Sequence, residues 1–441
     1  VYNGEIYNYI EVRKELEKQG TVFRTTSDTE VLVEAWAVWG EACLARFIGM
    51  FAFALWDGTD HTLTCVRDRF GIKPFHYSDT DKGFVFASEL KGLFVAGVPR
   101  EPDDVAWATF LRQGHYDHSE NTFFKDIKRL QPGHLLKVRS GCKPIIRRYW
   151  QLPVPFSRQD KSLTFSDACE ELRSIILDTV RVHLRSDVPL GLLLSGGVDS
   201  AVVLAATHQA GKVDVEGFHH YFPDPYSELP WVSEMVAAYG TKMHYYELLP
   251  EQVEAEFLNF TWYMEEPFGS LVLLALGPLY ALARQRNMKV MLDGNGSDDI
   301  FGGYQLHHTA YLADLLSSGQ EKKFKTELNL ASAHWNVTED QFVQKIGVLE
   351  SDQGFKTGPD LTLPVVTDVL SSATMNTPTI PLVVSGNCDS LLSQLIELGL
   401  TQTKIPRNTR FDDHVSMAYS FEQRVPMLDH RFCDFITRIP P

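Results

Sequence analysis

The sequence predicts two domains of different fold class, an N-terminal α+β domain and a C-terminal α/β domain with a doubly wound parallel sheet. The pattern changes part-way along the 441 residues. Before it changes, short alternating or apolar runs are separated by turn clusters, which is typical of hairpins. After it changes, helical stretches alternate with short apolar strands, which is typical of a parallel sheet. The Pro- and Ser-containing segment Gln151–Phe165 has no helical period. We therefore expect domains at residues 1–150 and 166–441.

The N-terminal domain is expected to contain a β-rich sheet built from hairpins, with helices between some of the strands. Alternating or apolar runs predict strands over Met50–Trp56, Thr62–Arg67 and Phe84–Ala87. Tyr9–Gln19 has its charges on one face and Thr29–Trp39 carries an apolar stripe, so both are expected to be helices.

The C-terminal domain is expected to alternate strands with helices. The predicted strands are 190–194, 213–218, 243–248 and 289–292, and the predicted helices are 167–182, 230–239 and 271–286. Ligands of such sheets bind beyond the carboxyl ends of the strands. Ser351–Ser390 is rich in Thr, Ser and Pro with little periodicity, and we expect an irregular insertion there.

Composition excludes several classes of partner. A net charge of −16 argues against nucleic acid or an anionic membrane as the main partner. No long uncharged apolar run predicts a membrane span. The cysteines are scattered without any CxxC pair, which favours reduced, mostly buried thiols in a cytoplasmic protein. They are Cys43, Cys65, Cys142, Cys169, Cys388 and Cys433.

The stretch GLLLSGGVDSAVVLAAT, Gly191–Thr207, predicts a strand, a glycine turn and the start of a helix. This order gathers backbone N–H groups and the positive end of a helix dipole at one point, which suits phosphate. The turn holds no lysine, so it is not a Walker A loop. SGGVDS resembles the pyrophosphate-binding loop of enzymes that cleave ATP between its α- and β-phosphates. The alternative is a plain strand-to-helix turn with helix-capping serines.

A second strand runs into a glycine turn in KVMLDGNGSDDIFGGY, Lys289–Tyr304. ATP requires Mg²⁺, which takes carboxylates together with phosphate oxygens. Asp199 in the first turn and Asp298 in the second are the candidate metal ligands. An ordinary polar turn is the alternative, whereas calcium is disfavoured because the EF-hand spacing is missing.

Four C-terminal segments resemble glutamine-dependent asparagine synthetases and occur in the order found in that family: LLLSGGVDS, EEPFG, MLDGNGSDDIFGGY and SMAYSFEQRVPMLDHRF. YNGEIYNY, TTSDTEVL, GMFAFALWD, RDRFGIKPFHY and FASELKGL resemble its glutaminase domain. The matches span nearly the whole chain.

The resemblance implies an Ntn-hydrolase-like αββα glutaminase (class II amidotransferase) followed by a PP-loop ATP pyrophosphatase. The implied enzyme is a carbon–nitrogen ligase that amidates aspartate to asparagine with glutamine-derived ammonia. ATP and Mg²⁺ would serve a β-aspartyl-adenylate route that releases AMP and pyrophosphate. Glutamine and aspartate are the implied substrates, and a homodimer is left open.

The resemblance also implies roles for residues of the nucleotide site. Leu193 would lie against adenine and Gly294 would supply backbone contacts. The remaining ATP-binding positions are Ser195, Gly196, Gly197, Asp199, Ser200, His220 and Asp293. Arg424 resembles a family arginine near the active site, and a structural ion pair with Glu422 or Asp429 is an equally weighted alternative.

One position departs from the family. Many asparagine synthetases read SGEGSDE where this chain reads DGNGSDD, so Asn295 stands in place of a glutamate that assists ammonia attack as a base. An amide cannot take a proton at neutral pH. This keeps open an amide-forming relative that acts on another carboxylate, of a saccharide or peptide, and a non-catalytic paralogue. His219 and His220 replace small or apolar residues of the adenine pocket; surface positions are the default expectation, and stacking on adenine is the alternative.

The glutaminase resemblance assigns four further residues. Asn3 and Gly4 would form an oxyanion hole, and Glu5 and Asp28 would bind the α-ammonium of glutamine. Read without the resemblance, Asn-Gly would predict a hairpin turn. RDRFGIKPFHY, Arg67–Tyr77, is expected to support the sheet and the domain interface.

The family's nucleophilic cysteine would precede Val1, and its adenylation lysine would follow Pro441. We therefore expect these 441 residues to be a piece cut at both ends, without glutaminase activity and with little or no synthetase activity. Cys43 and Cys65 are expected in the core rather than as nucleophiles.

Overall fold

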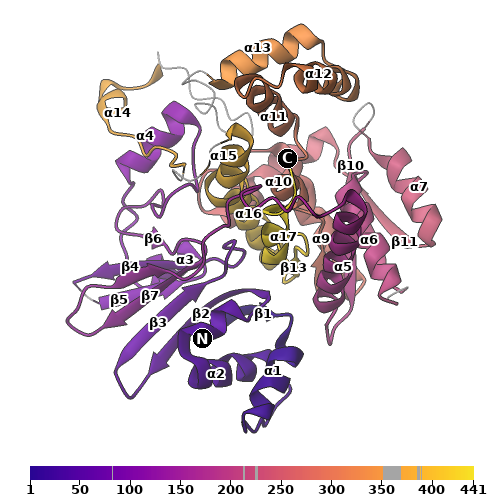
Figure 1. Ribbon diagram of the computed structural model, residues 1–441. Coiled ribbons are helices and arrows are strands. Elements are labelled where there is room, and N and C mark those ends of the chain that lie inside the picture. The colour runs from indigo at the N-terminus through magenta and orange to yellow at the C-terminus, as the bar shows by residue number, and fades with distance from the viewer. Residues whose placement is uncertain (82, 212–213, 224–226, 351–368, 385–387, 389) are drawn as a thin grey trace.

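The structure is a computed structural model that describes residues 1–81, 83–211, 214–223, 227–350, 369–384, 388 and 390–441. Its N-terminal part, which Figure 1 shows in indigo to magenta, contains two antiparallel sheets. The larger has the order β1-β2-β3-β7-β8 and the smaller β5-β4-β6. The strands are β1 (Tyr2–Ile6), β2 (Gly49–Asp57), β3 (Thr62–Arg67), β4 (His76–Thr80), β5 (Gly83–Ala87), β6 (Lys128–Arg129), β7 (His134–Arg139) and β8 (Ile145–Arg148).

The larger sheet is covered on both faces. Successive side chains of β2 point to opposite faces, as strand geometry requires. Phe51 and Phe53 pack with helices α1 (Tyr9–Lys18) and α2 (Asp28–Trp39). Ala52 and Ala54 pack against the smaller sheet. The helices and strands predicted for this part are confirmed within one or two residues at their ends.

The C-terminal part is built on one parallel sheet of order β11-β10-β9-β12-β13. Its strands are β9 (Leu190–Leu193), β10 (Glu216–Tyr221), β11 (Lys242–Glu247), β12 (Val290–Leu292) and β13 (Glu422–Arg424). The predicted strand over 213–218 is wrong in position, because pairing with β11 continues to Tyr221; its first residue, Val213, lies outside the described residues. The chain leaves β9 on one side towards β10 and returns on the other as β12. This reversal is a topological switch point, where α/β sheets bind ligands.

Helices cover both faces of this sheet (Figure 1). α5 (Phe165–His183) and α6 (Val198–Gln209) pack on the face carrying Leu190 and Leu192, and α7 (Leu229–Tyr239) contacts α6. α8 (Val253–Met264), α9 (Leu276–Gln285) and α16 (Ile405–Ala418) cover the face of Phe218 and Met291. The predicted helix 271–286 is a 3₁₀ turn, η3 (Leu271–Ala275), followed by α9.

Further helices flank the sheet. They are α3 (Leu90–Val95), α4 (Asp104–Gln113), α10 (Ser297–Phe301), α11 (Gln305–Ser317), α12 (Glu321–Trp335), α13 (Glu339–Glu350), α14 (Ser372–Asn376), α15 (Leu391–Leu398) and α17 (His430–Ile436), with short turns η1 (Gly40–Ala45) and η2 (Pro250–Gln252) and the π-helical η5 (Gly399–Thr403). Of the predicted insertion Ser351–Ser390, much lies outside the described residues, and the described remainder is irregular apart from α14. None of the described helices is long and apolar enough to cross a membrane.

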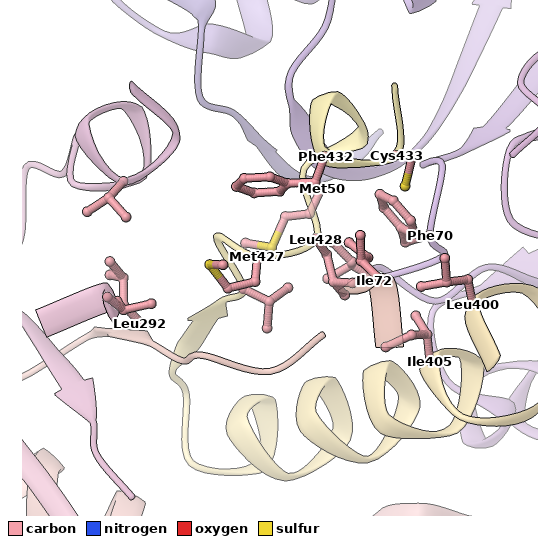
Figure 2. Packing of buried hydrophobic residues seen from close by; sticks show 14 of the residues in the cluster. Met50, Phe70, Ile72, Leu292, Leu400, Ile405, Met427, Leu428, Phe432 and Cys433 are labelled. Carbon is pink, nitrogen blue, oxygen red and sulfur yellow. The ribbon is translucent and has the colours of Figure 1, made fainter. Parts of the chain in front are cut away.

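One apolar cluster joins the two parts of the chain. Met50, Phe70 and Ile72 of the N-terminal part pack with Leu428 and Phe432 beyond β13 (Figure 2). This shared core fixes the larger antiparallel sheet relative to the parallel sheet. Because interiors are close-packed, the sites on either side of it are held at a defined distance.

The predicted role of RDRFGIKPFHY in supporting the sheet and the interface is confirmed. The buried Arg67 guanidinium donates to the carbonyls of Gly71, Lys73 and Leu130. Lys73 Nζ reaches across the interface to Asp413 Oδ1 at 2.8 Å, and both side chains are almost fully buried.

Candidate active sites

The two glycine turns singled out in the sequence meet at the switch point. The turn after β9 leads into α6, and the turn after β12 leads into α10. A side chain at Gly294 would lie 2.8 Å from the backbone of Asp199 and Ser200, so only glycine allows this approach. The pairing of β9 with β12 thus brings together residues a hundred positions apart.

The first turn is braced from within. Ser200 Oγ accepts from Ser195 N at 3.2 Å and donates to the carbonyl oxygens of Ser195 and Gly197. α6 has no side-chain cap, so the alternative of helix-capping serines is wrong. Gly196 N donates to Glu228 Oε2 at 2.9 Å. The Glu228 carboxylate therefore already accepts the N–H that an incoming phosphate would need.

A cavity of about 860 Å³ opens beside this turn. It is lined by Leu193, Leu194, Ser195, Phe218 to Pro223, Glu228, Leu248, Pro250, Val253, Leu276, Leu279 and Asp293. His219 is only 3% exposed, and its Nδ1 donates to the Leu194 carbonyl at 2.7 Å. The default expectation of surface histidines is therefore wrong for His219. Burial and then His219 lower the pKa of His220 to about 4, so the ring is neutral at pH 7.

Asp199 and Asp298 lie close enough to repel each other. Burial and then the charge of Asp298 raise the pKa of Asp199, and Ser297 and the Asp298 N–H donate to its carboxylate. Burial raises the pKa of Asp298, which Lys404 partly opposes. No set of three or more His, Cys, Asp or Glu in the described residues could hold a metal ion alone. Two neighbouring carboxylates suit Mg²⁺ that completes its coordination with substrate phosphates and water.

Behind the second turn lies a buried polar network. Asp293 Oδ2 accepts from Gln423 Nε2 at 2.8 Å, and Asp412 Oδ2 accepts from Asn295 Nδ2 at 2.9 Å. Asn408 donates to Asn295 Oδ1 at 3.4 Å. Burial and then the charge of Asp199 raise the pKa of Asp293 to about 6, while burial and then the charge of Asp293 raise the pKa of Asp412 to about 8. Such a pair titrates as a unit and retains a proton towards neutral pH.

Arg424 forms an ion pair with Glu422, which was one of the two alternatives predicted for this residue. Its guanidinium donates to Glu422 Oε1 at 2.6 Å and to the carbonyls of His183 and Arg185 at the end of α5. Asp429 pairs with Arg431 instead. Arg424 also comes within 4.0 Å of Glu5 Oε1, so it links the parallel sheet to β1.

The predicted glutamine site lies on β1. Asn3 and Gly4 are within the strand, opposite Ala52 and Phe51 of β2, so the alternative of a hairpin turn is wrong. Asn3 Nδ2 donates to Ser88 Oγ at 3.4 Å. Gly4 has φ +146°, and a Cβ there would lie 2.1 Å from the Met50 carbonyl oxygen. Glycine is required at this position.

Gly4→Ala is expected to lower the free energy of unfolding by about 2–4 kcal/mol, because it adds a clash with β2 to an unfavourable φ. Urea unfolding would measure the loss. Gly20 has a similar positive φ of +94° but no atom within 4 Å of its added Cβ. Gly20→Ala is therefore the matched control, with an expected loss of about 1 kcal/mol. Equal losses would show that the close approach to β2 is unimportant.

Glu5 on β1 and Asp28, the first residue of α2, lie close enough for the charge of Asp28 to act on Glu5. Asp28 Oδ2 accepts from Ile6 N at 3.0 Å and from Tyr2 Oη at 2.7 Å. Burial, then the charges of Glu422 and Asp28, raise the pKa of Glu5 to about 7. The two carboxylates concentrate negative charge at one partly exposed point, as a site for a cation requires.

The comparisons with known proteins match two family models to the chain. Residues 1–150 match the glutamine amidotransferase domain, and residues 171–441 match asparagine synthase. The chain belongs to the asparagine synthase family.

Named relatives of this family member differ in length and in name. "Asparagine synthetase [glutamine-hydrolyzing] 1" of Bacillus subtilis is 34% identical over 70% of this chain and 48% of its own length. "Asparagine synthetase [glutamine-hydrolyzing] 3" of the same species is 30% identical over 100% of this chain and 69% of its own. "Amidase chry2" of Gibberella zeae is 25% identical over 100% of this chain and 70% of its own. The chain thus spans about half to two-thirds of the length of these relatives.

Several residues of the nucleotide site belong to no motif that would have identified them from the sequence. Glu228 follows no recognisable motif and reaches the first turn only because α7 packs beside α6. Lys404 and Asp412 lie more than a hundred residues beyond the turn that they approach. A signal was available in the acidic pair Asp412–Asp413, which lies within a largely buried helix and is itself buried.

Proposed function

We propose that this protein is a glutamine-dependent ligase that amidates aspartate to asparagine. ATP would activate the side-chain carboxylate as a β-aspartyl-adenylate, and ammonia from glutamine would displace AMP. The observation that carries the proposal is the meeting of the two predicted turns, with paired carboxylates and a cavity, at the switch point of the parallel sheet. Family membership supports the same reaction class.

The same proposal assigns the finer fold and domain bounds. Residues 1–150 would form an Ntn-hydrolase-like glutaminase, which the helix–sheet–sheet layering supports. Residues 166–441 would form a PP-loop ATP pyrophosphatase, which the β9–turn–α6 order supports. The cytoplasm is the proposed location. None of the six cysteines, all of which lie in the described part of the chain, forms a disulfide in the structure, which suits a reducing compartment. A homodimer stays a prediction, which light scattering of the full-length protein would check.

At the nucleotide site, the N-terminus of α6 and Gly196 N–H would receive the pyrophosphate group. Glu228 would have to leave Gly196 first, because two anions cannot accept from one N–H. Leu193 and the neutral ring of His220 would flank adenine in the cavity. Asp199 and Asp298 would hold Mg²⁺, which neutralises the charge of the leaving group when bound.

At the glutamine site, Asn3 and Gly4 would stabilise the oxyanion that develops on the substrate amide. Glu5 and Asp28 would bind the α-ammonium. The shared apolar core holds this site in a fixed relation to the nucleotide site. Ammonia released at this site would then be the nucleophile at the nucleotide site.

The decisive experiment measures pyrophosphate release by the full-length protein with ATP and Mg²⁺ while the carboxylate is varied. Aspartate is expected to support release, with stoichiometric asparagine when ammonium is added. Release with no carboxylate dependence, or none at all, would overturn the proposal.

A second candidate acceptor is another carboxylate, such as that of a saccharide or peptide. Asn295, which donates its amide to Asp412, favours this alternative because position 295 itself carries no ionisable base. A relative of 25% identity carries the name amidase. Pyrophosphate release with a non-aspartate carboxylate alone would select this candidate.

Glutamine affinity is expected to depend on pH through Glu5. Its pKa is raised to about 7, so the carboxylate becomes charged as pH rises through that value and attracts the α-ammonium. Calorimetric binding of glutamine should therefore tighten from about one pH unit below to about one unit above that value. Glu5→Gln should remove the rise, whereas Glu15→Gln on the exposed face of α1 should keep it. A rise that survives in Glu5→Gln would assign it to another group.

A further inference from the structure

We propose that Asp412 accepts the proton of the ammonium that enters the acceptor site, and that Asn295 positions it. The proposal rests on the ligase function above and identifies the proton acceptor for its second step. That step needs a base, and the turn after β12 offers only an amide at position 295.

The geometry ties Asp412 to that turn. Asp412 lies on α16 and is 9% exposed. Asn295 Nδ2 donates to its Oδ2 at 2.9 Å, while Asn408 donates to the Asn295 oxygen and fixes the orientation of the amide. Asn295 therefore holds the Asp412 carboxylate of α16 beside position 295, where the side chain of Asn295 itself cannot act as a base.

The charges around Asp412 make it a proton acceptor rather than a permanent anion. The titratable groups that face it are Asp293 after β12, Asp413 on its own helix, and Tyr280 of α9. Asp413 is paired with Lys73, which leaves Asp293 as the close uncompensated neighbour. Burial and then Asp293 raise the pKa of Asp412 to about 8. A base is most effective when its pKa lies near the working pH.

Asp412 also lies between the two sites. On one side, Asp293 lines the cavity and Gly294 packs on Asp199. On the other, the Lys73–Asp413 ion pair reaches into the N-terminal part. Through Asp412 and Asp413, α16 therefore contacts both the turn after β12 and the N-terminal part.

The step balances as follows. An N–H bond of ammonium breaks, its electron pair stays on nitrogen, and the proton passes to the Asp412 carboxylate. The nitrogen lone pair then forms the bond to the acyl carbon while the π pair of the C=O bond moves to the carbonyl oxygen, and that pair reforms the C=O bond on collapse. On collapse, the C–O bond to the adenylate breaks with its pair going to the phosphate oxygen, which takes the second proton from nitrogen. The products are the amide, AMP and a protonated Asp412, which returns its proton to water.

The test compares two nucleophiles in the full-length protein and Asp412→Asn. With ammonium chloride, the variant is expected to lose about 100-fold or more in amide formation, the usual contribution of a general base. With hydroxylamine, which is already uncharged at neutral pH, hydroxamate formation should stay near wild type. Acceptor-dependent pyrophosphate release should also be kept. Asp434→Asn on α17 is the control and should change neither reaction.

A second variant guards against a purely structural effect. Asn295→Glu combined with Asp412→Asn returns a carboxylate to the turn and should recover ammonium use. Wild-type use of ammonium by Asp412→Asn, or equal losses with both nucleophiles, would overturn the role of Asp412. Failure of the wild type to release pyrophosphate with any carboxylate would instead overturn the proposed function.

Discussion

Asp117→Asn is expected to lower the free energy of unfolding by about 3–5 kcal/mol, because it leaves two buried guanidinium groups short of a counter-charge. Asp117 lies between Arg129 and Arg410 and its side chain is 2% exposed. Glu266 is the remaining carboxylate of the network and binds Arg129 at 2.7 Å. The network joins α16 to the loop before β6, so its loss should also loosen the contact between the two parts of the chain.

The effect should depend on pH with a defined sign. Burial raises the pKa of Asp117, but Arg410 and Arg129 outweigh it and hold the pKa below its ordinary value. Its stabilisation is therefore present above the unfolded-state pKa, about 4, and is lost as pH falls through the folded pKa. Urea unfolding of both proteins should show the difference shrinking in acid.

Asp126→Asn is the matched control. Asp126 is exposed and has nearly the same left-handed backbone, with φ +62° against +61° at Asp117. Asparagine tolerates that conformation, so both substitutions isolate the carboxylate charge. A loss at Asp117 no larger than at Asp126 would show that the buried network contributes nothing.

Asp298→Asn is expected to lower pyrophosphate release by about 10²–10³-fold, the usual size of one lost electrostatic contact to a developing charge. Removing its charge also relieves Asp199, whose pKa should fall towards the ordinary value. ATP binding without Mg²⁺ should therefore be kept or improved, while the Mg²⁺-dependent gain in affinity should disappear. Calorimetry with and without Mg²⁺ measures both.

Asp340→Asn is the control for Asp298→Asn. Asp340 also lies in the first turn of a helix, α13, and is exposed. It should leave release and binding unchanged. A weakening of ATP binding in Asp298→Asn both with and without Mg²⁺ would point to damage of the turn rather than loss of a metal ligand.

Local patterns were enough to predict some of the strands and helices. The apolar run Met50–Trp56 matches strand β2, and the apolar stripe of Thr29–Trp39 matches helix α2. The strand at 213–218 was misplaced because Phe218–Tyr221 is polar and aromatic and shows no alternation. Its extent is set by pairing with β11, which is a long-range contact.

The site could be predicted only in part, because motifs mark loops rather than the side chains that reach them from elsewhere. SGGVDS and DGNGSDD identified both turns. The exchange of glutamate for Asn295 was visible, yet the carboxylate beside it was not. His219 looked like a surface residue because two adjacent histidines are polar, whereas the Leu194 carbonyl accepts its N–H and permits its burial.

The sequence by itself determined the order of strands and helices, the two glycine turns and the family. The elements and turns follow from periodicity and from backbone positions that only glycine can occupy, which are local properties, whereas the family follows from the resemblance of several motifs in one order. The tertiary structure alone decided that β9 lies beside β12, that Glu228 occupies the Gly196 amide, and that Asp412 meets Asn295. These contacts depend on how separate elements pack around a shared core, and no local pattern records which distant side chain fills a given place.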